Sequence, residues 1–575
     1  MAFEQTNAND AEKVDSEVYI GPSHSFSFLK ETPVGIRRLA QPGDDSFVQG
    51  AISEIDKMSS RLRSSEVRTP IESSSRFHIP SKSAGYSLLG KFLEYAELGK
   101  PFFSFPSEDI LRQVVFEPEN VRERAWVVSF NYILLAAIST HDDEHEEKLR
   151  QNSQLALNDS RIFLEPSLAN IQALALLAVH GEDYAAPNTS WMLLGHACRQ
   201  AEALGLHIRS GKDTLNEWQH KLCLFWLLFT LDKSCALAFG RPAFLPLSVY
   251  QHVPLPDEQF MCKFSPHEKT QNSSFGSVVL KSTITLAKLM SDVLVVLSVG
   301  ESGKSKEDIW SNLEGWFAAT RVALTQAMED EQASADAHQI REMKLGINSV
   351  NFQYLHILTL LLKGDRSSAL RLSCAREAIS ILPSLVSNWG SVYNGVVWQL
   401  LYYPFTPFFV IFENIVQQPS QYTGYEDDLR LLATAVNYYA EMRSQMRLLS
   451  SLCSKLEHTT SVFFQLAQSH AGNLDREKAP KDKAPISQEE ESVRPWDDLI
   501  NMDLSDLNIT PYLNWLPIDM SHTSQILETE LQGPNPQPSH NSEECGPAHS
   551  EKPISGSTFD WFLWDDYYGS SNVGL

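Results

Sequence analysis

The chain has 575 residues, of which 43% are hydrophobic, so it can bury a large core and exceeds the usual length of one compact domain. Its formal net charge is −25. That charge argues against unaided binding to nucleic acid, which depends on Lys and Arg side chains that neutralise phosphates. The seven cysteines are scattered without a CxxC pair. This spacing argues against a disulfide framework or a cysteine-rich zinc module and favours a reducing compartment.

The sequence predicts a soluble protein with no membrane contact. Its first residues, MAFEQTNANDAEK, lack the basic start and apolar stretch of a signal peptide. The longest uncharged apolar run, 396–412, is interrupted by Gln399, Pro404 and Pro407. It is also shorter than the roughly 20 residues that a membrane-spanning helix needs. We therefore interpret this run as buried core.

Residues 1–85 are rich in Ser, Glu and Asp and are predicted to be a flexible segment. From residue 86 to residue 472 the apolar pattern is helical nearly throughout, with polar residues at helix starts and glycines at helix ends. Ser107 precedes an acidic first turn, Thr189-Ser190 opens a helix over 189–207, and Gly205 lies in its last turn. The fold class predicted is all-α, with one large multi-helix regulatory domain.

Within this domain, the segment 222–231 is apolar on every side and is predicted to lie inside the helical mass. The remaining apolar residues recur at helical spacing without alternating strand patterns. The further helices expected on this basis cover residues 277–297, 306–328, 338–363, 367–388, 391–417, 426–452 and 453–470.

A linker rich in Lys, Ala and Pro occupies residues 473–495, and the composition then becomes acidic and aromatic over 496–575. From residue 489 onward there are 16 acidic residues and two basic ones, a net charge of 2 − 16 = −14. Acidic-aromatic mixtures are typical of disordered activation segments, although the tail could also be simply a solvated acidic end. The candidate activation residues are Trp496, Leu499, Trp561, Phe562, Trp564 and Tyr567.

Two stretches resemble catalytic or binding motifs without completing them. Gly303-Lys304-Ser305 matches the end of a phosphate loop, but Ser298 stands where the first glycine belongs and the preceding residues have helical spacing. His141 and His145 are spaced as two zinc ligands could be, yet they lie in an acidic string with no assignable third ligand. We predict that the chain is not an enzyme, with nucleotide binding at the Gly303–Ser305 loop as a remote alternative.

Two consecutive helical stretches resemble the middle homology region of fungal binuclear-zinc-cluster transcription factors. They are SWMLLGHACRQAEALGLHI (190–208) and EWQHKLCLFWLLFTLDKSCALAFGRP (217–242). The segments VYIGPSHSFSFL (18–29) and YYPFTPFFVIFENIV (402–416) are similar to other parts of the same proteins. The positions that match the pattern are Trp191, Ala197, Gly205, Leu206, His207, Trp226, Asp232, Gly240, Arg241 and Pro242.

The resemblance implies a nuclear transcription regulator of all-α fold, with control by a small metabolite or by intramolecular masking as the two alternatives. The family also carries a zinc-binding cluster of six closely spaced cysteines, but the first cysteine here is Cys198. No cofactor is therefore expected within this sequence, and direct contact with DNA is doubtful. The chain is either part of a longer form or acts without its own DNA-reading module.

The motif positions are interpreted as mainly structural. Gly240 can close the second helix in a left-handed conformation, and Pro242 prevents its continuation. Arg241 could donate to the last free carbonyls or pair with Asp232, with ligand contact as the alternative. Trp226 is expected to pack in the core.

The sequence therefore predicts a transcription regulator with a helical regulatory domain and an acidic activation tail. The expected partners are coactivators or the transcription machinery, and a related DNA-binding transcription factor or a second copy of the chain. Two alternatives remain, namely a non-activating helical scaffold that sequesters a related regulator and a nucleotide-binding enzyme.

Overall fold

The computed structural model describes residues 76–478, apart from 97–98, 100, 138–142, 181–186, 265–271, 300–304, 364–367, 387–396, 418–424 and 446–449. Throughout these ranges the regular structure is helical, and none of the described residues forms a strand. The all-α class predicted from the sequence is confirmed. Helices begin at Lys82 and end at Lys478, a few residues beyond both bounds predicted for the domain. Residues 1–75 of the segment predicted to be flexible (1–85), most of the predicted linker and the whole acidic tail lie outside the described residues.

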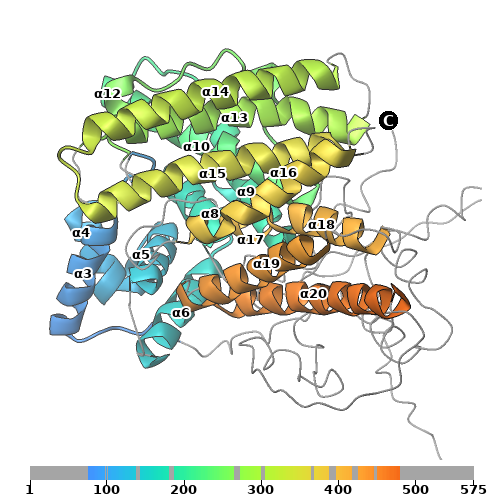
Figure 1. Ribbon diagram of the computed structural model, residues 1–575. Coiled ribbons are helices and arrows are strands. Elements are labelled where there is room, and N and C mark those ends of the chain that lie inside the picture. The colour runs from blue at the N-terminus through green and yellow to red at the C-terminus, as the bar shows by residue number, and fades with distance from the viewer. Residues whose placement is uncertain are drawn as a thin grey trace, which may run out of the picture.

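The helices follow one another along the chain in the order shown in Figure 1. The first group comprises α3 (Lys82–Ala96), α4 (Glu108–Phe116), α5 (Ala125–Ala137), α6 (Asp143–Leu157), α8 (Leu168–His180), α9 (Pro187–Ala203) and α10 (Leu215–Phe239). The second comprises α13 (Ser274–Val299), α14 (Lys306–Glu331), α15 (Ala337–Leu361), α16 (Ser368–Ile381), α18 (Phe405–Gln417), α19 (Tyr425–Gln445) and α20 (Ser450–Lys478). Short helical turns connect them: α7 (Arg161–Leu164), α11 (Leu247–Tyr250), α12 (Glu258–Met261), α17 (Val397–Leu401) and the 3-10 turns η3 (Pro118–Asn120) and η5 (Leu382–Leu385).

Helix α10 lies in the middle of the fold. It packs against α9 on one side and α13 on the other, and it also contacts α17. Its side chains are buried almost continuously from Leu222 to Phe239. Within the described ranges, α10 is the one helix long and apolar enough to span a membrane. Because 94% of its most apolar window is buried inside the structure, it has the environment of a core helix.

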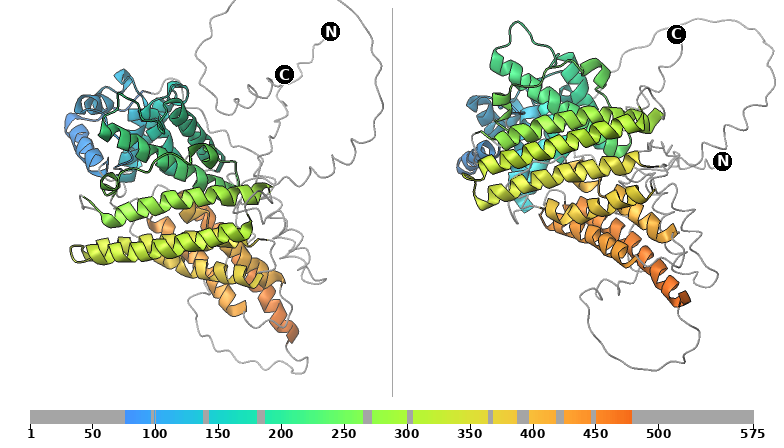
Figure 2. Two further views of the ribbon diagram at one scale, coloured as in Figure 1. Left: turned by 90° about the horizontal axis from the view of Figure 1, so that it is seen from above. Right: turned by 45° about the horizontal axis from the view of Figure 1, so that its top comes forward.

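The three long helices α13, α14 and α15 run side by side across the molecule (Figure 2). The carboxylate of Glu331, at the end of α14, accepts a hydrogen bond from the Phe275 N–H (2.7 Å) and others from the hydroxyls of Ser273 and Ser274. A carboxylate here satisfies free N–H groups in the first turn of α13 and complements the helix dipole. The end of one long helix thus fixes the start of its neighbour.

Helices α16, α18, α19 and α20 pack together beyond α15. The buried Asp428 of α19 receives two hydrogen bonds from the Arg376 guanidinium of α16, at 2.6 and 2.9 Å. It receives a third at 3.0 Å from the amide of Asn414 on α18. A buried carboxylate needs such partners to offset the loss of water. Asp428 therefore holds three helices in register.

The helix expected over 391–417 is two helices in the structure. Its described part begins at Val397, breaks after Leu401 and resumes at Phe405. Pro404 lies at the break, and its carbonyl accepts the Phe408 N–H at 3.1 Å as the new helix starts. Pro407 falls in the first turn of α18, where a proline removes no helical hydrogen bond. Helical periodicity alone did not distinguish one helix over 391–417 from the two consecutive helices α17 and α18.

His356 of α15 illustrates how completely this core excludes water. Its side chain is fully buried, and its ring stacks on Tyr403 with the centroids 3.9 Å apart. Burial disfavours the charged form and lowers the pKa of His356 to about 3. The imidazole is therefore neutral in the folded protein at physiological pH.

This neutral histidine should make the fold sensitive to acid. The unfolded chain takes up a proton near pH 6.5, but the folded chain does so only near pH 3, so stability is lost as the pH falls through this window. Between pH 7 and pH 5 the expected loss from this group is about 2 kcal/mol. We expect the His356→Phe variant, measured by chemical unfolding at both pH values, to lose less stability than the wild type.

The exposed His252 supplies the control. His252→Phe should show the wild-type dependence of stability on pH, because this side chain meets water in both states. If His356→Phe lost as much stability between pH 7 and pH 5 as the wild type, the buried imidazole would not be the acid-sensitive group.

Candidate functional site

Hydrogen bonds within the chain fix both ends of α10. At its start, Thr214 Oγ1 accepts the Glu217 N–H at 3.2 Å, while Glu217 Oε2 accepts the Thr214 N–H at 2.9 Å. At its end, Gly240 has the left-handed conformation expected from the sequence, with φ 60°. The Arg241 N–H then donates to the Ala236 carbonyl at 3.1 Å. This pairing satisfies the last carbonyls of the helix and reverses the chain.

Helix α9 ends in the same way. Gly205 has φ 62°, and the Leu206 N–H donates to the Ala201 carbonyl at 3.1 Å. The chain then places His207 between two aromatic rings of the core, Phe225 of α10 at 5.8 Å and Tyr250 of α11 at 5.1 Å between centroids. The Gly-Leu-His motif therefore ends α9 and packs the exit of that helix against α10.

The reversal after Gly240 brings the backbone to a pair of buried charges. Asp232 and Lys233, both 1% exposed, form an ion pair at 2.6 Å. The Asp232 carboxylate also accepts the N–H groups of Phe244 at 2.8 Å and Leu245 at 2.9 Å. The Lys233 ammonium donates to the Leu245 carbonyl and lies 4.4 Å above the ring of Phe229. Both charges are thus supplied with partners by the segment that follows the Gly240 turn.

The segment after Gly240 also contacts the start of α9 and joins it to α10. Trp191 Nε1 donates to the Pro242 carbonyl at 3.1 Å, and the Trp191 ring packs on Phe244 with the centroids 4.7 Å apart. The guanidinium of Arg241 lies 5.4 Å from the centre of the Trp191 ring. Such a cation–π contact contributes about 0.5–1 kcal/mol at a partly exposed site. The structure therefore gives Trp191, Arg241 and Pro242 a shared structural role.

Trp226 lies two turns before Lys233 on α10. Its side chain is fully buried, and Nε1 donates to the Pro254 carbonyl at 2.8 Å. The Lys288 ammonium of α13 lies 4.5 Å above the ring, and burial lowers the pKa of that lysine. The core role expected for Trp226 agrees with this packing, whereas sequence patterns gave no sign of its contact with Lys288.

A buried polar network beside the ion pair was not anticipated. Gln399 of α17 donates to Ser234 Oγ at 3.1 Å and to Gln353 of α15 at 3.2 Å. The Tyr403 hydroxyl donates to the Ser234 carbonyl at 3.4 Å. Ser234, Gln353 and the neighbouring pair of Gln399 and Tyr403 are far apart in sequence and carry no common motif, so single-sequence reasoning offers no signal for their meeting.

Neither incomplete motif becomes a site among the described residues. The apolar residues before Gly303 belong to helix α13, not to the strand that a phosphate loop requires, and Ser305 Oγ caps α14 by accepting the Asp308 N–H at 3.0 Å. His145 lies in α6, while His141 and residues 300–304 fall outside the described ranges. No cluster of three potential metal ligands occurs in the described part of the chain.

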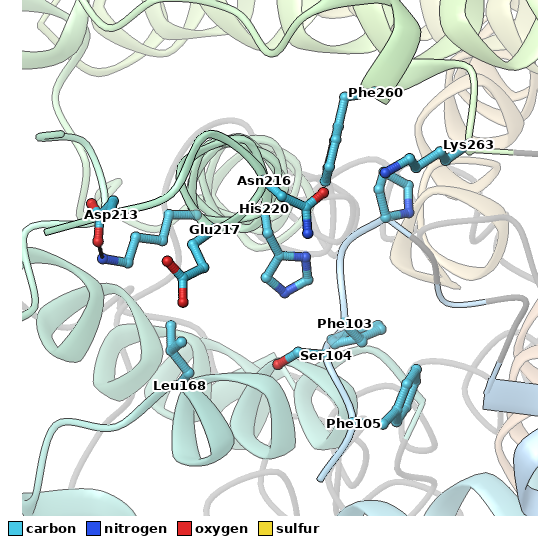
Figure 3. Close-up of a pocket in the computed structure, with 12 residues that line it drawn as sticks. Phe103, Ser104, Phe105, Leu168, Asp213, Asn216, Glu217, His220, Phe260 and Lys263 are labelled. Carbon is cyan, nitrogen blue, oxygen red and sulfur yellow. Dashed lines mark hydrogen bonds and ion pairs between the residues drawn. The ribbon is translucent and has the colours of Figure 1, made fainter. Parts of the chain in front are cut away.

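A cavity of about 430 Å³ opens beside the first turns of α10 (Figure 3). Its apolar wall consists of Phe103, Phe105, Leu168 and Phe260. Polar residues of the α10 segment line the other side: Asp213, Asn216, Glu217, His220 and Lys221. Lys263 lies at the edge, its ammonium 3.9 Å from the centre of the Phe260 ring. Aromatic surface and a few polar groups thus converge on one space, as in small-molecule sites.

Most of the charges around this cavity already have partners. Lys221 donates to Asp213 at 2.6 Å, and this bond together with one from the Ser210 N–H holds the pKa of Asp213 below its usual value. Hydrogen bonds from Thr214 do the same for the pKa of Glu217. Burial lowers the pKa of His220, which favours the neutral imidazole.

Residues 127–328 match the fungal specific transcription factor domain. This range extends from α5 to α14 and includes α9, α10, the Gly205 and Gly240 turns and the ion pair. The resemblance to the middle homology region of fungal transcription factors, found in the sequence, is confirmed over these residues.

Curated relatives agree with this class. A transcriptional regulator of Claviceps purpurea is 25% identical over 512 residues, which cover 86% of this chain and 77% of the relative. An uncharacterized transcriptional regulatory protein of Schizosaccharomyces pombe is 24% identical and covers 64% of this chain and 61% of its own length. An ABC-transporter-regulating transcription factor of Aspergillus fumigatus is 21% identical over 83% of this chain and 58% of the relative. These relatives are regulators, not enzymes, in agreement with the class predicted for this chain.

The turn at Gly240 offers a direct test of the fold-back. Any residue with a side chain loses about 1–2 kcal/mol in the left-handed conformation. Gly240→Ala should therefore lower the free energy of unfolding by at least about 1 kcal/mol, with a further loss if Asp232 loses its backbone partners. Chemical unfolding measures both effects together.

Gly315→Ala is the matched control. Gly315 lies inside α14, and a Cβ added there would meet no atom within 4 Å. Alanine favours a helix interior over glycine by roughly 0.5–1 kcal/mol, so this variant should be as stable as the wild type or more so. Equal stability losses in the two variants would contradict the role given to the Gly240 turn.

Proposed function

We propose that this chain regulates transcription in the nucleus through its helical domain and an acidic activating tail. The observation that carries the proposal is the match of residues 127–328 to the fungal specific transcription factor domain. The relatives named as transcriptional regulators support it, because they align along much of the chain. Since the chain spans only 61% and 58% of two of these relatives, activities of the whole relatives come to this chain as proposals.

Recruitment to DNA is proposed to come from a partner or from a cysteine-rich module in a longer form. The net charge of −25 disfavours contact with phosphates through the chain's own surface. The partner proposed is a related DNA-binding transcription factor, or a second copy of the chain in a longer form that carries the zinc cluster. The helical domain, with its buried charges fully partnered, serves as the regulatory body to which such a partner and the tail are attached.

Activation is assigned to residues 496–575 on composition alone. Aspartates flank Trp561, Phe562 and Trp564 in the sequence DWFLWDD. Mutual repulsion among the carboxylates keeps such a segment from collapsing on its own aromatic side chains. A coactivator groove can then bind the aromatic residues as the segment folds on contact. The partners proposed for the tail are coactivators or the transcription machinery.

We expect residues 476–575, tethered to a foreign DNA-binding domain, to activate a reporter gene. Replacing Trp561, Phe562 and Trp564 together by Ala should reduce the signal to near background, because the aromatic surface bound by the coactivator is lost. Ser570, Ser571 and Asn572 replaced together by Ala provide a control that should retain activity. A silent wild-type fusion with confirmed expression would exclude the activating tail and leave the non-activating scaffold.

The pure 575-residue chain should bind promoter DNA weakly at most. Its affinity, measured by mobility shift between 50 and 200 mM salt, should lack the steep salt dependence that phosphate contacts produce. Adding a related zinc-cluster factor should recruit the chain to the DNA. Tight, salt-sensitive binding by the chain alone would contradict recruitment through a partner.

A further inference from the structure

The cavity beside α10 has charges of both signs along its lining, and they balance. The lining comes from four separated stretches of sequence: 101–105, residue 168, 213–221 and 260–263. Its two lysines, Lys221 and Lys263, are matched by two carboxylates, Asp213 and Glu217. The lining therefore offers no surplus charge to a charged occupant, and an uncharged one, which loses least on leaving water, fits it best.

Phenyl rings form much of the wall. Phe103 and Phe105 lie on one side of the open space, and Phe260 lies on the other (Figure 3). The volume of about 430 Å³ has room for more than one aromatic side chain. The carboxamide of Asn216 points into the same space, and its donor and acceptor can pair with a peptide group (Figure 3). The cavity thus suits an uncharged peptide segment with aromatic side chains.

One stretch of the chain outside the described residues has this chemistry. Residues 18–29, VYIGPSHSFSFL, are the longest run without a charged residue among residues 1–75. Over 24–28 (HSFSF) aromatic residues alternate with serines, so an extended chain presents Phe26 and Phe28 on one face and serines on the other. We propose that the cavity binds residues 18–29 of the same chain, with Phe26 and Phe28 between its phenyl walls.

The cavity lies within reach of this segment. Arg76, the first described residue, is close to Lys82 at the start of α3. Phe92 lies about 15 Å further along that helix, and its ring packs on Phe105 of the cavity wall with the centroids 5.8 Å apart. Residues 30–75, which join the segment to α3, can span about 150 Å when extended. Covalent attachment also raises the effective concentration of the segment, so modest contacts can hold it in the cavity.

A second uncharged run occurs in the acidic tail, at 507–518 (LNITPYLNWLPI). It is flanked directly by Asp506 and Asp519, whereas the N-terminal segment has one charge of each sign at its ends. Docking of the tail run would bring two aspartates toward Asp213 and Glu217, where like charges repel. The N-terminal segment is therefore the better occupant.

Photo-crosslinking in the full chain tests this contact directly. With p-benzoylphenylalanine in place of Phe26, irradiation should join that position to the cavity lining, and peptide mass spectrometry identifies the joined residues. The same crosslinker in place of Phe47, another aromatic position among residues 1–75, is the matched control. It should give about tenfold less of the cavity product, the ratio that a preference of about 1.4 kcal/mol produces. The proposal is overturned if the two positions give equal yields.

Filling the cavity should remove the product. In the chain that carries the crosslinker at Phe26, Leu168→Trp should lower the yield about tenfold, because the larger ring occupies the space. Leu164→Trp, at an exposed leucine outside the lining, should leave the yield unchanged. Circular dichroism checks that both variants remain helical. An unchanged yield in a helical Leu168→Trp variant would refute docking in this cavity.

Hydrogen exchange tests which face of the segment enters the cavity. Phe26→Ser combined with Phe28→Ser should speed amide exchange of residues 102–105 about threefold, since the wall is no longer covered. Ser25→Ala combined with Ser27→Ala alters the opposite face and should exchange like the wild type. Equal effects of the two pairs, or no effect of the first, would contradict insertion of the phenyl face.

Two further outcomes concern the identity of the occupant. When isotope-labelled and unlabelled chains are mixed before irradiation, the cavity products should join residues of one chain, and products between chains would assign the cavity to a second copy. A cavity product from the crosslinker at Trp515, but not at Phe26, would assign it to the tail. Either result overturns the proposal. These measurements do not depend on transcription, so they can be separated from a failure of the proposed function.

Discussion

The interaction on which the centre of this fold depends is the buried ion pair of Asp232 and Lys233. Both groups lie on a helix surrounded by protein, where a charge without partners would destabilise the fold by roughly 3–5 kcal/mol. Because both side chains are only 1% exposed to solvent, the chain itself must supply donors and acceptors. The backbone of residues 244–245 does so, and it reaches the pair because Gly240 reverses the chain directly after the helix.

This requirement explains why Gly, Arg and Pro follow one another. Glycine accepts the left-handed conformation at no steric cost, and proline cannot continue the helix. Once the chain is reversed, Trp191 bonds the Pro242 carbonyl and stacks beside Arg241, so that α9 is fixed against the exit of α10. The contact of Lys288 with the ring of Trp226 joins α13 to α10. The motif residues therefore join one buried helix to its neighbours α9 and α13.

Local patterns in the sequence predicted the helices and the two glycine turns, because capping and periodicity are encoded by neighbouring residues. They did not predict the partner of Asp232. The sequence offered Arg241 as one partner of Asp232, whereas the structure pairs Asp232 with the adjacent Lys233, although neighbouring residues on a helix normally point apart. In the structure the two side chains meet because both turn toward the returning backbone. The Gln399 network and the cavity were also beyond prediction, since their residues meet only where helices cross.

The two ends of α10 thus have different surroundings. The end at Gly240 is closed, because the Arg241 N–H donates to the Ala236 carbonyl and Trp191 Nε1 donates to the Pro242 carbonyl. The beginning of the helix lines an open cavity, where its side chains carry charges of both signs, with Asp213 and Glu217 beside Lys221. The Gly240 end is therefore occupied by the chain's own backbone, whereas the Thr214 end borders a space that the described residues leave open.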